Sequence, residues 1–131
     1  MKKLSDHDEL TAWSSRFASF NDAVLKSWAV KFAATGAVLE VVIEAQDQES
    51  PSGWSLVSLR LCKVTSLRFC DGPKASYQVL SNGLHALLDT GCVALEFGDF
   101  IDIPESLTEL MSSPCHAVAE TLEWGVQPVP Q

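Results

Sequence analysis

Apolar and polar residues alternate along much of the chain, and a period of two is typical of β-strands with one buried face. The clearest example runs from Leu39 to Ala45, where Glu40 and Glu44 separate the apolar positions. The same pattern predicts further strands in five other stretches: 24–32, 54–64, 83–88, 92–97 and 115–126.

Within these strands the alternation divides buried from wetter positions. The residues expected in the core are Leu39, Val41, Ile43, Val57, Leu59, Leu61, Val93, Leu95 and Phe97. Those expected on wetter faces are Glu40, Glu44, Arg60 and Glu96. A shift of one residue in any strand would exchange its two sets, so the solvent exposure of these side chains tests the register.

Two stretches have helical rather than strand character. The first is Ser5 to Phe17, with Ser5 at the N-cap, acids in its first turn and Leu10, Trp13 and Phe17 on one face. We expect that face to pack against the sheet. The second, 105–111, follows Pro104, a residue that fits the first turn of a helix because its missing N–H is not needed there.

The connections between strands are too short for parallel crossovers, so the sheet should be antiparallel. The run 33–36 and the turn 89–91 fit hairpins, and the polar stretch 46–53 reads as an exposed loop. A chain of 131 residues, 47% of them hydrophobic, fits one domain. We therefore predict a single mainly β (α+β) domain over 1–131. Its antiparallel sandwich or curled sheet has about six or seven strands, an N-terminal helix and a short inserted helix.

The sequence contains no pattern that indicates catalysis. GxSxG, HExxH, Gly-rich phosphate loops and EF-hand loops are all absent, so we expect no enzyme, no catalytic residue and no cofactor. Cys62, Cys70, Cys92 and Cys115 lack the paired spacing of a metal site, and we expect reduced thiols and no metal.

The formal net charge of −8 narrows the classes of partner. It argues against nucleic acid and against anionic membranes, which both attract basic proteins. No run approaches the roughly 20 apolar residues of a membrane span. The acids that follow Leu4 do not fit a signal peptide, so we expect a cytoplasmic protein. The charge serves either solubility or attraction of a basic partner.

The stretch Phe17-Ala18-Ser19-Phe20-Asn21-Asp22-Ala23 resembles the F-x-S-F-H-D-A signature of a family of small bacterial immunity proteins from polymorphic toxin systems. The segments 54–69 and 79–84 are also similar to that family, although Asn21 stands where the signature has His. The resemblance implies a non-enzymatic inhibitor that binds a cognate toxin, a basic protein partner. Read from the residues alone, the same stretch fits a capping turn at the start of a strand.

Two groups of loop residues are candidates for binding such a partner. They are Asp47, Glu49 and Trp54 at one edge, and Asp99, Asp102 and Glu105 beside the inserted helix. The alternative interpretation is a small-molecule-binding or metabolic domain. In that case the curled sheet would enclose a pocket near His85 or His116, where either histidine can pair with a carboxylate.

Overall fold

The computed structural model describes residues 1–70, 78–98 and 100–130. Its helices are α1 (His7–Arg16) and α2 (Leu107–Leu110), with a single 3-10 turn, η1 (Ala18–Phe20). Its strands are β1 (Lys2–Lys3), β2 (Ala23–Ala33), β3 (Gly36–Gln46), β4 (Trp54–Arg68), β5 (Val79–Leu80), β6 (Leu84–Asp89), β7 (Cys92–Phe97) and β8 (His116–Pro128).

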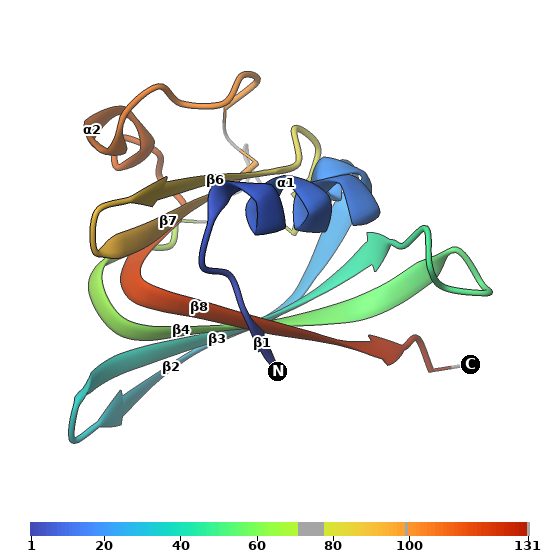
Figure 1. Cartoon of the computed structure of the whole chain (residues 1–131), viewed down its shortest axis with the longest axis horizontal. Coiled ribbons are helices and arrows are strands. Elements are labelled where there is room, and N and C mark those ends of the chain that lie inside the picture. The colour runs from blue at the N-terminus through green and yellow to red at the C-terminus, as the bar shows by residue number, and fades with distance from the viewer. Residues whose placement is uncertain (71–77, 99, 131) are drawn as a thin grey trace.

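The strands form one antiparallel sheet in the order β5-β2-β3-β4-β8-β7-β6, and β1 pairs with β8 beside this path. Figure 1 shows the sheet curling so that β6 and β7 lie above the long strands. The two ends of the path are joined in sequence, because only residues 81–83 separate β5 from β6. The predicted antiparallel curled sheet with an N-terminal helix and a short inserted helix is confirmed.

The curl comes from the two longest strands, β4 and β8, which serve both halves of the sheet. Residues 55–62 of β4 pair with the second half of β8, and a register shift between Val64 and Ser66 precedes the pairing with its first half. Lys63, next to that shift, has φ +56°. A bulge bends a strand and increases its twist. The bend lets the β6–β7 hairpin fold over β2, β3 and β4.

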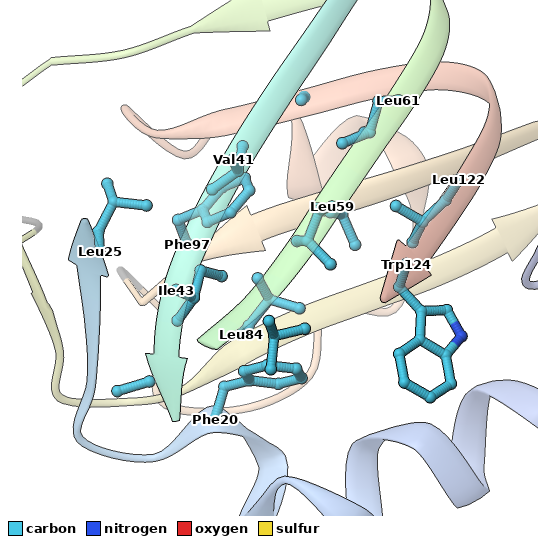
Figure 2. Packing of buried hydrophobic residues seen from close by; sticks show 14 of the residues in the cluster. Phe20, Leu25, Val41, Ile43, Leu59, Leu61, Leu84, Phe97, Leu122 and Trp124 are labelled. Atoms are coloured by element: carbon cyan, nitrogen blue, oxygen red, sulfur yellow. The ribbon is translucent and has the colours of Figure 1, made fainter. Parts of the chain in front are cut away.

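The core lies inside the curl, and all nine residues predicted to be buried are found there. Side chains from β3, β4, β7 and β8 converge in Figure 2, where Phe97 faces Val41 and Ile43. Trp28 of β2 meets Phe97 edge to face, with ring centroids 5.1 Å apart. Because Phe97 comes from the folded-over half of the sheet, this contact joins the two halves.

Helix α1 covers one open end of the curl. Its N-cap is Asp6, whose carboxylate accepts the Glu9 N–H at 2.8 Å, so the helix begins one residue later than the predicted cap at Ser5 implies. Trp13 and Phe17 are buried as expected. They meet Trp124 of β8, which Figure 2 shows turned toward the helix, at centroid distances of 6.5 and 5.8 Å. This aromatic cluster attaches α1 to the sheet.

The connection between β7 and β8 folds back over the outer face of these two strands, at the upper left of Figure 1. Helix α2 in this connection begins after Ser106 rather than at Pro104, because Ser106 is its N-cap and its hydroxyl accepts a hydrogen bond from the Glu109 N–H. Leu110 packs on Ala94 and Val118 to form a second small core. The prediction that Glu96 lies on a wet face is wrong. Glu96 points outward as the alternation requires, but the connection covers it and it is fully buried.

None of the helices in the described ranges has the length and apolarity to cross a membrane. The four cysteines are thiols rather than disulfides: Cys62, Cys70, Cys92 and Cys115. Cys70 is exposed and Cys115 is buried, while the other two are half-buried.

Candidate functional site

A groove of about 460 Å³ lies between α1, the turn after it, β6 and the segment that follows β7. We call it the α1–β6 groove. Its lining is a mixture of apolar and polar side chains: Leu10, Thr11, Trp13, Ser14, Ser15, Ser19, Asn21, Asn82, Leu84, His85, Ala86, Ile101 and Ile103. Apolar walls with a few convergent polar groups are typical of binding sites.

His85 in the groove wall is held by the buried carboxylate of Glu96. The two residues are cross-strand neighbours on β6 and β7, and His85 Nδ1 lies 2.9 Å from Glu96 Oε2. The other oxygen of Glu96 accepts from the Ser113 hydroxyl at 3.1 Å and from the Phe100 N–H at 3.3 Å. The contact to Glu96 involves Nδ1 alone, so the second ring nitrogen, Nε2, is not part of it.

His116 continues this row onto β8, where it lies opposite Glu96. Its Nδ1 is 2.7 Å from the carbonyl oxygen of Ser113, so that nitrogen carries a proton. Its Nε2 is 3.2 Å from the hydroxyl of Ser66. Both ring nitrogens are therefore occupied, and His116 is only 4% exposed. His116 therefore holds Ser113, in the connection between β7 and β8, against β8. Of the two histidines, only His85 lines the groove.

The turn at the end of α1 has an unusual backbone. Ala18, Ser19 and Phe20 have φ values of +53°, +56° and +58°, the left-handed region that L-residues seldom adopt consecutively. Strain of this kind persists only where the surroundings enforce it. The buried Phe20 side chain anchors the turn in the core, and Ser19 and Asn21 reach the groove.

Gly83, which precedes β6, makes room for this turn. Its φ is +77°, and a Cβ atom added there would lie 2.3 Å from the carbonyl oxygen of Ser19 and 2.8 Å from Oδ1 of Asn21. Only glycine fits so close an approach. The segment Phe17–Ala23, which resembles the immunity-protein signature, thus forms the tight junction between α1 and the sheet and one wall of the groove.

Trp13 adds an unused donor to this region. The side chain lines the groove and is 3% exposed, and within the described residues its Nε1–H has no hydrogen-bond partner. A buried N–H without a partner is uncommon in folded proteins, and occupation by a water molecule or a ligand is a usual reason for one.

The rim of the groove is apolar and acidic. Ile101 and Ile103 are 82% and 66% exposed, and Asp102 between them is exposed as well. Glu105 follows nearby and is also exposed, while Asp99 lies outside the described residues. Of the described members of the predicted 99–105 group, Asp102 therefore lies between two residues that line the groove, and Glu105 follows three residues later.

The other predicted group, at the β3–β4 turn, is only partly on the surface. Trp54 and Glu49 are exposed, but Asp47 is 3% exposed, which corrects its placement among surface contacts. Its carboxylate accepts hydrogen bonds from Arg16 at 2.9 and 3.1 Å, from the Ser55 hydroxyl at 2.6 Å and from the Glu49 N–H at 3.0 Å. Asp47 is a structural residue that orders the turn.

The charge of Asp47 follows from the same contacts. Burial opposes the charged form, but the hydrogen bonds from Arg16, Ser55 and Glu49 outweigh it and lower the pKa of Asp47 to about 2. The hydrogen bond to Asp47 in turn raises the pKa of Arg16. The pair is therefore ionised at neutral pH and holds no spare charge for a ligand.

Sequence reasoning missed the groove lining from α1 and the turn after it. The positions Thr11, Ser14 and Ser15 show only as the polar side of an amphipathic helix, and that pattern does not distinguish a groove wall from an ordinary surface. Within the described residues, no three His, Cys, Asp or Glu side chains converge in a way that could hold a metal ion.

Comparison with protein-family models, with curated proteins and with solved structures found no match for this chain.

Proposed function

We propose that this protein is a non-enzymatic binding domain that receives a surface loop of a basic protein partner in the α1–β6 groove. The observation that carries the proposal is the rim, where the strongly exposed Ile101 and Ile103 flank an exposed acid, Asp102, beside a groove. Exposed apolar side chains grouped at a concave site are characteristic of protein-binding surfaces.

The polar lining of the groove suits a peptide segment. Thr11, Ser14, Asn82 and His85 bring hydroxyl, amide and imidazole groups to the groove, and a peptide backbone supplies both donors and acceptors for them. None of the groove-lining residues described above is a lysine or an arginine, and the net charge is −8. These features favour a basic partner over an acidic one.

The kind of partner is suggested by the resemblance of residues 17–23 to immunity proteins. On that analogy the partner is a cognate toxin, and binding blocks its active or substrate-binding surface. In this proposal Asp102 and Glu105 contribute electrostatic attraction, and the two isoleucines contribute the buried contact.

The test is a pull-down with the proteins encoded by neighbouring genes of the source genome, each expressed separately. We expect one basic protein to bind. Ile101→Ser with Ile103→Ser should abolish binding mainly by faster dissociation, whereas Asp102→Asn with Glu105→Gln should slow association and reduce its dependence on salt. Exposed charges contribute little to folding, so thermal stability should be unchanged.

A matched control is Val30→Ser with Phe32→Ser, which removes two exposed apolar side chains at the far end of the β2–β3 hairpin. It should leave binding intact. The proposal fails if no neighbouring protein binds or if the control pair weakens binding as much as the rim pair. A small molecule that copurifies in the groove would support the ligand-binding interpretation instead.

A further inference from the structure

A second pocket, of about 380 Å³, lies on the outer face of the sheet, away from the α1–β6 groove. It is lined by Val24, Glu44, Ser52, Trp54, Val129 and Pro130. The strand register explains the grouping, since Glu44 lies directly opposite Val24 of β2, and Trp54 of β4 lies opposite Gln46, two residues farther along β3. Glu44 and Trp54 are thus diagonal neighbours on one face.

The pocket combines a free carboxylate with an exposed indole ring. In residues 1–70, 78–98 and 100–130, the Glu44 side chain has no hydrogen-bond or ion-pair partner, although it is only half-exposed. Trp54 is 39% exposed. The remaining walls, from Val24, Val129 and Pro130, are apolar, and none of the lining residues named above is basic.

The backbone that carries Trp54 is fixed before any ligand arrives. The Trp54 carbonyl accepts from the hydroxyls of Ser50 and Ser52 at 2.8 and 3.1 Å. The turn itself is closed by the Asp47 N–H, which donates to the carbonyl of Gly53 at 2.8 Å. A site on an ordered turn loses less entropy on binding than a flexible one.

We infer that this pocket binds the side chain of one arginine of the partner protein. A guanidinium stacks on an indole ring and pairs with a carboxylate at the same time, and its methylene stem packs against apolar walls. A neutral ligand would leave Glu44 unused and an anion would be repelled by it. This inference rests on the proposed function for the source of the arginine, but the pocket can be tested without the partner.

The experiment uses N-acetyl-arginine-N-methylamide as the probe, with the norleucine analogue as the apolar control ligand. Titration is followed by NMR at the indole N–H of Trp54. We expect saturable shifts with the arginine compound alone. Glu44→Gln should weaken binding about threefold or more, and Trp54→Leu should abolish saturable shifts of the Ser52 and Glu44 amides.

Glu40→Gln is the matched control variant, because Glu40 lies on the same face of β3 but is paired with Lys31. Its affinity for the probe should equal that of the unaltered protein. If Trp54→Leu does not fold, Trp54→Phe should bind several-fold more weakly. Equal shifts with both ligands, or an unchanged affinity in Glu44→Gln, would overturn the inference.

The two proposals fail separately. If the arginine probe does not bind but a neighbouring protein is still captured, only the arginine pocket is overturned. If the probe binds but no protein is captured, the proposed function is overturned and the pocket remains a guanidinium site.

Discussion

Arg16, the last residue of α1, donates hydrogen bonds to both carboxylate oxygens of Asp47, at 2.9 and 3.1 Å. The two residues are 31 positions apart in the chain, and their contact joins α1 to the β3–β4 turn. The same carboxylate orders the β3–β4 turn through Ser55 and the Glu49 N–H. One buried acid therefore connects the helix that forms the groove to the turn that presents Trp54.

This contact should make stability depend on pH in the acid range. The folded protein lowers the pKa of Asp47 to about 2. The contribution of Asp47 to the free energy of unfolding is therefore fully present above its unfolded pKa of about 4, and it is lost as the pH falls toward 2. The contribution is about 2 kcal/mol. Asp47→Asn should remove that part of the pH dependence, measured by urea unfolding between pH 7 and pH 2. Glu49→Gln, which alters an exposed partner of Arg16, should change the curve far less. Identical pH profiles for Asp47→Asn and the unaltered protein would contradict this assignment.

The buried Glu96 should be much more sensitive to substitution than an exposed acid of the same sheet. Glu96→Ala leaves His85 Nδ1 and the Phe100 N–H without the carboxylate that they contact, and we expect a loss of about 3–5 kcal/mol in unfolding free energy. Glu120→Ala breaks a surface pair with Lys63 whose side chains are both 52% exposed, and should cost under about 1 kcal/mol. Urea midpoints measure both. A loss in Glu96→Ala no larger than in Glu120→Ala would show that the carboxylate is not held as described.

Substituting two glycines that have almost the same φ allows the cost of backbone strain to be distinguished from the cost of a steric clash. Gly83 and Gly91 have φ values of +77° and +75°, but an added Cβ would meet the Ser19 carbonyl at 2.3 Å in the first case and nothing within 4 Å in the second. Gly91→Ala should therefore cost about 1–2 kcal/mol, the penalty for the left-handed conformation alone. Gly83→Ala should cost clearly more and should shift the NMR signals of Ser19 and Asn21. Equal losses in the two variants would mean that the junction is looser than the distances indicate.

The aromatic cluster at the end of the curl should dominate the stability of α1. Trp13 touches Phe20 and Trp124 with centroid distances of 4.8 and 6.5 Å, and Trp13→Ala should cost about 3–5 kcal/mol. Trp54→Ala, an exposed tryptophan, is the matched control and should cost less than about 1 kcal/mol. Denaturant midpoints followed by far-UV circular dichroism give both values. A midpoint unchanged in Trp13→Ala would show that the helix does not stabilise the sheet.

The sequence by itself determined the six longer strands and, away from the bulges, which way their side chains point; it did not predict the two-residue strands β1 and β5. A strand has a period of two, so the alternation of Leu39, Val41 and Ile43 with Glu40 and Glu44 was sufficient to assign both faces. Short connections likewise required antiparallel pairing. The buried face of α1 was readable for the same reason, because Trp13 and Phe17 repeat with the helical period.

Only the tertiary structure decided what covers each outward face. Alternation places Glu96 on the outer side of β7 but contains no information about the segment 100–115, which folds over it and buries it against Ser113. Asp47 is polar and lies in a polar loop, yet Arg16 arrives from another element and makes its burial favourable. The α1–β6 groove has the same origin, since its walls come from distant segments brought together by the bend in β4 and β8. A local pattern fixes the direction of a side chain, whereas its surroundings depend on contacts between residues far apart in the chain.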